Sequence, residues 1–349
     1  MPLVSLVVVN WNGRHYLEKL FESLRKVTYP AVEIILVDNA SQDDSVAFTR
    51  ENYPEIKVVQ LDKNYMFARG NNEGVKAAKG EIIGLVNNDV VVDPGFIEPV
   101  VEAFQKYPEA AACQSKILDL NNPTKFEYAG AAGGYIDRFG YPFLRGRLFF
   151  TVEEDAGQYD TETALFWSSG ACMFIRKSVW QQTGGMDEDF TLHMEEIDLC
   201  WRIRLLGYQI RFVPQSRVWH KGGGTMSAED PRKVFWNYRN NIFLLVKNLS
   251  GVNLAKILLI RLFMDILATA GELARGKPAG AFSIIRAYGW VISHIKLMVR
   301  KRRAVQNIRK VSDSFIYQLI YPGSIVWEYF ILKRKLFGEL KYHHRLIEE

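Results

Sequence analysis

Short runs of β-branched and other apolar residues alternate with longer mixed stretches over the first third of the chain. The runs are too short for ordinary helices and predict strands at 3–9, 33–37, 56–60, 81–86 and 111–118. The stretches between them predict helices at 14–26, 43–52, 70–78 and 95–106. Strands that alternate with helices are expected to be parallel, with right-handed crossovers. The pattern therefore predicts an α/β fold with a doubly wound, mostly parallel sheet flanked by helices.

The middle of the chain has a less regular pattern. Residues 119–168 contain several glycines and aromatic residues, which suit a flap or a small mixed sheet. The residues after them predict a strand at 171–176, helices at 178–183 and 195–206, and a strand at 209–213. The sequence Trp219-His220-Lys221-Gly222-Gly223-Gly224 is expected to form a loop that ends this region.

The last third of the chain, from Pro231, has a helical pattern and a different charge. From Arg232 to the end there are 21 Lys and Arg and 7 Asp and Glu, whereas the residues before it contain 23 and 32. Such an asymmetry indicates two regions with different partners. We therefore expect one domain over 1–231 and a basic, amphipathic helical region over 232–349.

This basic region is expected to lie on a membrane surface. The stretch 252–271 is apolar, but its Lys256, Arg261 and Asp265 make it unsuitable as a spanning helix. This stretch is better suited to lie in the plane of the membrane interface, with its apolar residues towards the lipid tails and its Lys and Arg at the headgroups. Basic clusters at 300–303 and 333–335 would favour anionic lipid. The alternative is a soluble helical domain with a solvated basic face, and no nucleic-acid motif accompanies the charge.

The cysteines indicate a reducing compartment. Cys113, Cys172 and Cys200 are far apart and lack C-x-x-C spacing, which argues against a disulfide framework or a cysteine zinc site. The chain starts directly with a predicted strand, so a cleaved signal peptide is not expected. We therefore expect the protein at the cytoplasmic face of the cell membrane.

Polar residues follow three of the predicted strands at the point where each strand ends. They are Asn10-Trp11-Asn12-Gly13, Asp38-Asn39 and Asn87-Asn88-Asp89. In an open parallel sheet, ligands bind outside the carboxyl ends of the strands, so these clusters should face one crevice. Mg²⁺ is usually held by one or two carboxylates plus phosphates and water, and Asp89 can supply one carboxylate. Asn87 suits a ribose, and Asp38 suits a base N–H. A turn or a helix cap is the structural alternative for both acids.

Two further segments could contact a nucleotide or a metal. In the segment 64–72, Arg69 can stack on a base or pair with phosphate, and Asn71 or Asn72 can reach the sugar. A lone histidine is more often structural than a ligand, but His220 lies beside a run of glycines that could close over a diphosphate. Its imidazole would favour Mn²⁺ or a similar ion.

The sequence Glu195-Glu196-Ile197-Asp198 opens a predicted helix and is the candidate for a general base. A base that deprotonates an alcohol must be an ionised carboxylate within hydrogen-bond reach. The helix dipole favours acids in a first turn whatever their role, and Asp198 could simply pair with Arg202. Three acids within four positions are more than a cap needs, which favours a catalytic role for the cluster.

Together these segments resemble the inverting glycosyltransferases of family 2, with the GT-A fold, over roughly residues 3–245. The resemblance rests on the order and spacing of 4–13, 37–41, 67–72, Asn87-Asn88-Asp89, 184–190, 195–202 and Trp219-His220. The sequence looks most like bacterial rhamnosyltransferases and related enzymes of surface polysaccharide synthesis. The resemblance implies a catalytic domain over 1–231, with a nucleotide-sugar half at about 1–118 and an acceptor half at about 119–231.

The resemblance also implies roles for individual residues. Binding of the nucleotide sugar is expected of Asn10, Asn12, Asp38, Asn64, Arg69, Asn71, Asn87 and Asn88. Asp89 and His220 are expected to bind Mg²⁺ or Mn²⁺, and Trp167, Ser169 and Gly170 are expected to border the acceptor. Glu196 stands where the family has its base, with Glu195 and Asp198 as rivals. Three positions depart from the family pattern: Asn87 replaces the first acid of the D-x-D motif, Glu196 replaces an aspartate, and Met66 stands where glycine is common.

The sequence therefore predicts a metal-dependent inverting glycosyltransferase. Its donor would be a dTDP- or UDP-linked sugar, with rhamnose as the candidate, and its acceptor a lipid-linked or polysaccharide hydroxyl. One alternative is a sugar nucleotidyltransferase, which needs a glycine-rich basic loop after the first strand, where this chain has Gly13 alone. The other is a non-catalytic scaffold at the membrane surface.

Overall fold

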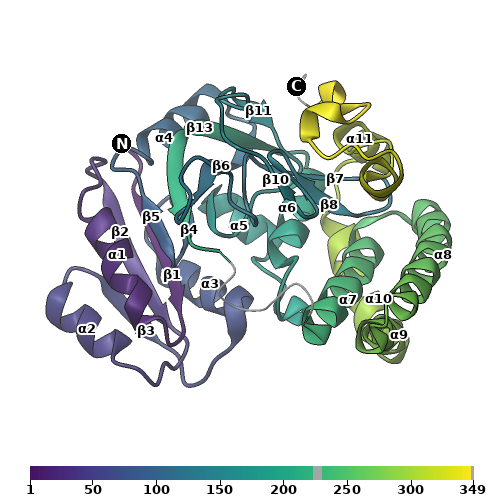
Figure 1. Ribbon diagram of the computed structural model, residues 1–349. Helices are drawn as coiled ribbons and strands as arrows, with labels where there is room; N and C mark the ends of the chain where they lie inside the picture. Colours follow the sequence, from purple (N-terminus) through teal and green to yellow (C-terminus); the bar gives the residue numbers. More distant parts are fainter. Residues whose placement is uncertain (223–229, 347–349) are drawn as a thin grey trace.

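The computed structural model describes residues 1–222 and 230–346, and it begins with the predicted α/β layer (Figure 1). Parallel strands lie in the order β4 (Ile82–Asn87), β1 (Val4–Asn10), β2 (Val32–Asp38) and β3 (Lys57–Gln60). The helices of this half are α1 (Arg14–Leu24), α2 (Ser45–Asn52), α3 (Met66–Ala77) and α4 (Glu98–Lys106). Both faces of β1 are buried, with Leu6 in one apolar cluster and Val7 in another, because helices cover both sides of the sheet. The predicted doubly wound fold is confirmed.

The sheet continues beyond β4 with strands of both directions. These are β12 (Cys172–Arg176), β6 (Ala110–Asp119), β13 (Gln209–His220), β11 (Thr163–Ala164) and β5 (Val90–Val92). β12 is antiparallel to β4, and the backbone N–H of Asn87 donates to the carbonyl of Ala171, just before β12 (3.0 Å). The chain that enters β12 therefore lies at the edge where the parallel strands end.

β13 is longer than the strand predicted at 209–213. It continues to His220 through a register shift between Val213 and Arg217, and its last residues pair with β5 and β6. The prediction that Trp219 and His220 lie in a loop is therefore wrong, because sheet hydrogen bonds satisfy their backbone groups. Of the glycines predicted to continue that loop, Gly223 and Gly224 lie outside the described residues.

The irregular segment 119–168 contains a small sheet, which is antiparallel throughout rather than mixed. Its strands are β7 (Gly134–Ile136), β8 (Pro142–Leu144), β9 (Arg147–Leu148) and β10 (Thr151–Val152). After β12 come α5 (Lys177–Thr183) and α6 (Glu195–Leu205), where helices were predicted, and between them the 3-10 turn η1 (Glu188–Phe190), which was not predicted.

The C-terminal region is helical, as predicted, and lies beside α6 (Figure 1). Its elements are α7 (Pro231–Asn248), α8 (Gly251–Ala274), α9 (Pro278–Ser293), α10 (Ile295–Ile308), α11 (Asp313–Leu319) and the short turns η2 (Trp327–Ile331), η3 (Phe337–Glu339) and η4 (His343–Leu346). α7 packs against α6, α9 and α10. Within the described ranges, no helix combines the length and apolarity required to traverse a bilayer.

Candidate active site

Polar side chains at the carboxyl ends of β1 and β2 form one hydrogen-bonded cluster. Asn10 pairs in register with Asp38. Its Nδ2 donates to Ser45 Oγ (3.0 Å), and its Oδ1 accepts from Asn88 Nδ2 (2.7 Å). A Cβ added at Gly13 would lie 2.3 Å from Asn88 Nδ2, so a larger residue there would displace the Asn10–Asn88 pair. The cluster therefore joins the turns after β1, β2 and β4.

Asp38 has a carboxylate with one unsatisfied oxygen. The side chain is buried, and Oδ2 accepts from the backbone N–H of Ser41 (3.0 Å). Oδ1 has no hydrogen-bond partner in the part of the chain that the structure describes. A buried oxygen without a donor is costly. Nearby, Asn12 Oδ1 accepts from the backbone N–H of Gln42 (2.7 Å), which holds the turn after β2.

The segment that leads into α3 presents a cation and uses two of its predicted asparagines internally. The Arg69 guanidinium lies 3.7 Å from the centre of the Tyr65 ring and is partly exposed. Asn64 Oδ1 accepts from the backbone N–H of Met66 (2.8 Å), and Asn71 Nδ2 donates to the carbonyl of Phe67 (2.9 Å). Met66 has a φ of 64°, a conformation that glycine adopts more easily, which accounts for the glycine that is common at this position in the family. Arg69 is therefore the group that this segment offers to a ligand.

Asp89 and His220 meet where β4 and β13 end. Asp89 Oδ1 lies 3.0 Å from His220 Nε2, and Glu127 Oε2 lies 3.3 Å from Nδ1 on the other side of the ring. Asn87 Nδ2 is 3.3 Å from the same Nε2. Burial alone would lower the pKa of His220, but the two carboxylates raise it to about 10. Burial would raise the pKa of Asp89, but the hydrogen bond to His220 lowers it.

Sequence reasoning did not find Glu127. It lies in the irregular segment 119–168, where an isolated acid belongs to no periodic pattern or motif. The fold buries it and gives it a second bond, from the backbone N–H of Ala129 (2.7 Å). Only the pairing of β13 with β6 brings this carboxylate behind His220.

The Asp89–His220 pair fits one edge of the coordination shell of a divalent metal. Adjacent ligands of an octahedral ion with bonds of about 2.1 Å are roughly 3.0 Å apart, as Asp89 Oδ1 and His220 Nε2 are. Among residues 1–222 and 230–346, no group of three His, Cys, Asp or Glu side chains is placed to hold an ion. Glu127 can fix the tautomer of His220 through Nδ1, as carboxylates behind metal-binding histidines do.

Glu195 and Glu196 begin α6 with uncompensated carboxylates. Oε2 of each has no hydrogen-bond partner among the described residues. Glu195 is buried and Glu196 is half-buried. Burial raises the pKa of both side chains, and the neighbouring Glu196 raises that of Glu195 further. A carboxylate whose pKa is raised towards neutral pH is a stronger base once ionised.

The turn before α6 is strained and is held by α7. Thr191, His193 and Met194 have φ values of 65°, 69° and 70°, which non-glycine residues rarely adopt. Asn240 Nδ2 of α7 lies 2.7 Å from the carbonyl oxygens of both Leu192 and His193. The C-terminal region therefore fixes the direction in which the Glu195 and Glu196 side chains leave the helix.

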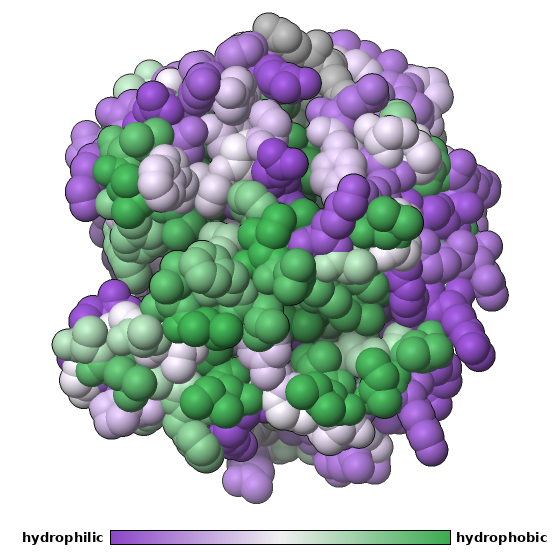
Figure 2. Space-filling view, turned by 90° about the vertical axis from the view of Figure 1, so that its right-hand side faces the viewer, coloured by the Kyte–Doolittle hydropathy of each residue, from purple (hydrophilic) through white to green (hydrophobic). Residues whose placement is uncertain are grey.

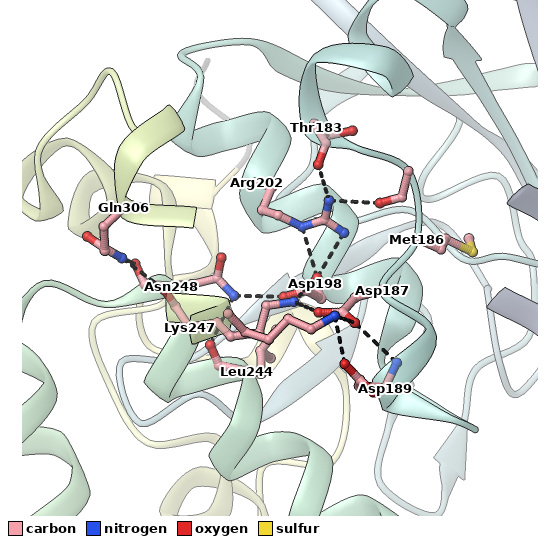
Figure 3. A network of polar contacts seen from close by, with 12 residues as sticks. Thr183, Met186, Asp187, Asp189, Asp198, Arg202, Leu244, Lys247, Asn248 and Gln306 are labelled. Carbon is pink, nitrogen blue, oxygen red and sulfur yellow. Dashed lines mark hydrogen bonds and ion pairs between the residues drawn. The ribbon is translucent and has the colours of Figure 1, made fainter. Parts of the chain in front are cut away.

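Asp198 is occupied by a buried ion network (Figure 3). Its oxygens accept from Arg202 Nε (2.9 Å), Lys247 Nζ (2.8 Å) and Asn248 Nδ2 (3.0 Å). Lys247 also binds Asp187 (2.5 Å). Burial would raise the pKa of Asp187, but Lys247 and Lys301 lower it. Asp198 therefore joins α6 to α7 instead of facing an acceptor.

Of the residues predicted to border the acceptor, Gly170 lies beside Glu196. A Cβ added at Gly170 would lie 3.8 Å from Glu196 Cβ and 3.0 Å from the Phe67 ring. The neighbouring Ser169 is buried, and its N–H donates to Gln114 Oε1 (2.8 Å). Trp167 is also buried, and its Nε1 donates to the carbonyl of Tyr135 (2.8 Å). The acceptor roles of Trp167, Ser169 and Gly170 remain predictions.

A chain of direct neighbours joins Asp38 to Glu196 along one edge of the sheet. Asn10 pairs with Asp38, Val9 pairs with Asn87, and Asn87 bonds to Ala171, which follows Gly170 beside Glu196. Asp89 lies two residues after Asn87. The predicted nucleotide-sugar, metal and base residues are therefore brought together. A cavity of about 490 Å³ at the opposite edge, next to Gly80 and Arg176, contains none of them.

Comparison with known proteins identifies the family. Residues 5–182 match the family described as Glycosyl transferase family 2. The N-acetylglucosaminyl-diphospho-decaprenol L-rhamnosyltransferase of Mycobacterium tuberculosis is 24% identical over 264 residues, which are 71% of this chain and 86% of that protein.

Solved structures share the architecture. S. aureus TarS 1–349 in complex with UDP-GlcNAc has a TM-score of 0.56 at 16% identity, covering 90% of this chain and 91% of that chain. The mannosyltransferase PcManGT from Pyrobaculum calidifontis, in complex with GDP-Man and Mn²⁺, has a TM-score of 0.52 at 13% identity, covering 88% and 86%. The family match argues against the nucleotidyltransferase alternative. The chain belongs to glycosyl transferase family 2 and is a glycosyltransferase with the GT-A fold.

Proposed function

We propose that this enzyme is a metal-dependent, inverting glycosyltransferase that moves a sugar from a nucleoside diphosphate to a hydroxyl of a lipid-linked or polysaccharide acceptor. One observation carries the proposal: the free oxygen of Asp38, the Asp89–His220 pair and the uncompensated Glu196 lie along one edge of the sheet. The M. tuberculosis relative, named for rhamnosyl transfer to a decaprenol-linked acceptor, supports rhamnose and a lipid-linked acceptor as the first candidates.

The donor would lie across the ends of β1, β2 and β4. Asp38 Oδ1 would accept a hydrogen bond from a base N–H of a dTDP or UDP donor, and Arg69 would stack on the base or pair with phosphate. Asn10, Asn12 and Asn87 would seat the sugar-phosphate part. Because Asn10 and Asn12 already bond within the cluster, they act mainly by holding the turns in shape.

Asp89 and His220 would hold the metal. A bound Mg²⁺ or Mn²⁺ supplies Lewis-acid stabilisation of the departing diphosphate. Glu127 keeps the His220 ring oriented through Nδ1, and Asn87 takes the place of a second carboxylate. Mn²⁺ in the related PcManGT structure is consistent with this use of the edge.

Glu196 would act as the base. Its carboxylate takes the proton of the acceptor hydroxyl while that oxygen forms a bond to the anomeric carbon. The bond to the diphosphate breaks on the opposite face, so the anomeric configuration inverts. Ser169 and Gly170 would border the acceptor. We assign the role to Glu196 rather than Asp198, because Asp198 already binds Arg202, Lys247 and Asn248.

A lipid-linked acceptor would place the enzyme at the cytoplasmic face of the cell membrane as a peripheral protein. The basic helices after α6 would provide the attachment.

The proposal is tested by release of nucleoside diphosphate from a panel of dTDP-, UDP- and GDP-linked sugars, with either Mn²⁺ or EDTA. We expect one donor class to be turned over with Mn²⁺ and turnover to fall at least 100-fold with EDTA. Equal turnover with EDTA would contradict the metal role. No turnover of any donor, with a lipid-phosphate acceptor present, would contradict the proposed reaction.

A further inference from the structure

Helix α8 buries charged side chains and exposes apolar ones, the reverse of an ordinary helix at a water-exposed protein surface. Its buried positions are Ile257, Arg261 and Asp265, which lie four residues apart on the inner face. Its outer face carries large apolar side chains that are mostly exposed, namely Leu259 (72%), Phe263 (62%), Ile266 (57%) and Leu267 (57%). The headgroup position expected for Arg261 is therefore wrong, because this side chain points into the protein.

A network of polar contacts keeps the charges of α8 inside. Arg261 pairs with Asp265 (3.4 Å) and donates to the carbonyl of Phe139 (2.9 Å). Asp265 also accepts from the hydroxyls of Tyr141 (3.1 Å) and Tyr288 (2.7 Å). Since these bonds fix the rotation of the helix, the apolar face is held outward and cannot turn into the core.

The neighbouring helices extend the apolar surface. α9 packs on α8 and exposes Phe282, Ile285 and Ile292. The C-terminal segment around η2 lies at the same end of the molecule and exposes Trp327 and Ile331 (Figure 1). Figure 2 shows this end of the molecule, where apolar side chains form a broad band across the middle and lower part. A monomeric protein surface rarely has an apolar area of this extent without a partner.

The charge at this end is positive. Between residues 251 and 308 there are ten Lys and Arg and two acidic residues, Asp265 and Glu272. Both acids are paired, with Arg261 and Arg275. A basic stripe on α10 is formed by Lys296, Arg300 and Arg303, which are exposed along a groove of about 410 Å³ and form no salt bridge within the described ranges. The partner of this end should therefore be apolar and carry negative charge.

We propose that the outward face of α8 and α9 inserts into the surface of an anionic bilayer, with the basic stripe of α10 at the headgroups. The inference rests on the peripheral attachment proposed above and names the surface and the lipid chemistry. A second copy of the chain would bring a second set of uncompensated cations to the contact, whereas anionic lipid supplies the missing negative charge. Because no described helix can cross a bilayer, the helices lie in the interface.

This orientation brings the acceptor half of the active site towards the lipid. Arg261 of α8 bonds to Asn241 of α7, and Asn241 with its neighbour Asn240 contacts the turn at 190–194 that precedes Glu195. One helix layer therefore separates the apolar face from that turn. The nucleotide half lies at the far side of the sheet (Figure 1) and would remain open to water-soluble donors.

The experiment measures binding of the full chain to vesicles by co-sedimentation. Vesicles of phosphatidylcholine alone are compared with vesicles that also contain phosphatidylglycerol. We expect binding to the anionic vesicles, at least tenfold weaker binding to phosphatidylcholine, and weakening by salt. Phe263→Gln/Leu267→Gln should reduce binding to anionic vesicles at least tenfold. The control Ala47→Gln/Ser178→Gln adds the same amides at exposed positions of α2 and α5, away from the apolar face, and should bind like the wild type.

Two charge-reversal variants separate the attraction of the basic stripe to lipid from the effect of the net charge of the protein. Arg300→Glu/Arg303→Glu should weaken binding to anionic vesicles, whereas Lys19→Glu/Lys26→Glu on the distant α1 side should not, although the net charge changes equally. The proposal would be overturned if the wild-type protein did not bind anionic vesicles, or if the Phe263/Leu267 variant bound them as tightly as the wild type does. The proposal would also be overturned if the full chain formed a dimer that did not bind vesicles and the Phe263/Leu267 variant were a monomer. Donor turnover with a water-soluble acceptor should be unchanged in the Phe263/Leu267 variant, so failure of the proposed reaction is seen separately.

Discussion

At the residue scale, the roles of the acids in α6 follow from their partners. Asp198 and Glu196 are two positions apart in one helical turn. Arg202, Lys247 and Asn248 surround Asp198 and bond to its carboxylate oxygens. Glu196 receives backbone hydrogen bonds but forms no ion pair among the described residues, and its desolvation raises its pKa. The same desolvation makes an ionised Glu196 reactive towards a hydroxyl proton.

The pH dependence of the reaction should reflect this burial. A base must be ionised, so kcat/KM should fall as the pH falls through the raised pKa of Glu196, with a midpoint above about 4.3, the ordinary value of a glutamate. The folded state binds the Glu196 proton more tightly than the unfolded state, so stability is lost as pH rises above that ordinary value. Glu196→Gln should therefore melt at or above the wild-type temperature at pH 8. An acid limb at the ordinary glutamate value would contradict the assignment.

Variants of Asp89 and Glu127 should distinguish a residue that binds the metal directly from one that acts through His220. Asp89→Ala should abolish metal-dependent turnover with an unchanged circular dichroism spectrum. Glu127→Gln should weaken Mn²⁺ affinity by about 10–100-fold and keep turnover at saturating Mn²⁺, as loss of an orienting carboxylate does. The measurement is a Mn²⁺ titration of turnover. Undiminished activity of the Asp89 variant would rule out its role as a ligand.

At the scale of elements, α7 connects the catalytic helix to the C-terminal region. Asn240 holds the strained turn before α6, and Lys247 bridges Asp187 and Asp198. Both contacts are made by side chains from outside the segment 5–182 that the family model matches. The direction of Glu196 therefore depends on a helix that lies beyond the matched part of the chain.

Replacing Lys247 should lower the free energy of unfolding. Lys247→Met leaves Asp187 and Asp198 buried with fewer cations, and breaking a buried pair in this way costs about 3–5 kcal/mol. Lys301 and Arg202 remain, so we expect the lower end of that range in the free energy of unfolding measured with urea. The control Lys76→Met breaks an exposed pair with Glu73 and should cost less than about 1 kcal/mol. Equal effects of the two changes would contradict a stabilising network.

At the scale of the whole molecule, the sequence predicted what depends on local pattern. β1 and β4 are mostly apolar runs that end in an asparagine, so their positions and the shared edge followed from the topology of parallel strands. β13 was predicted too short because Gln215, Ser216 and Arg217 interrupt its pattern at the register shift. The position of Glu127 and the rotation of α8 depend on tertiary contacts, which no local pattern contains.

The division at residue 231 remains a prediction, and the contacts of α7 indicate how to examine it. A fragment of residues 1–230 lacks Lys247 and Asn248, two of the three partners of Asp198, and lacks Asn240, which holds the turn at 190–194. It should therefore lose a cooperative thermal transition. A fragment of residues 1–249, which keeps α7, should recover part of it. Melting of the shorter fragment within about 5 °C of the full chain would show that the first region folds without the helices.

The most direct test of the site compares donor binding and transfer in Glu196→Gln. If Glu196 is the base and the donor is held by the opposite end of the same edge, donor Kd should stay within about threefold of the wild type. The rate of sugar transfer should fall by about 10²–10⁴-fold, the usual contribution of a general base. Asp198→Asn, by contrast, should act mainly through stability. Transfer by Glu196→Gln at more than a tenth of the wild-type rate would contradict the account.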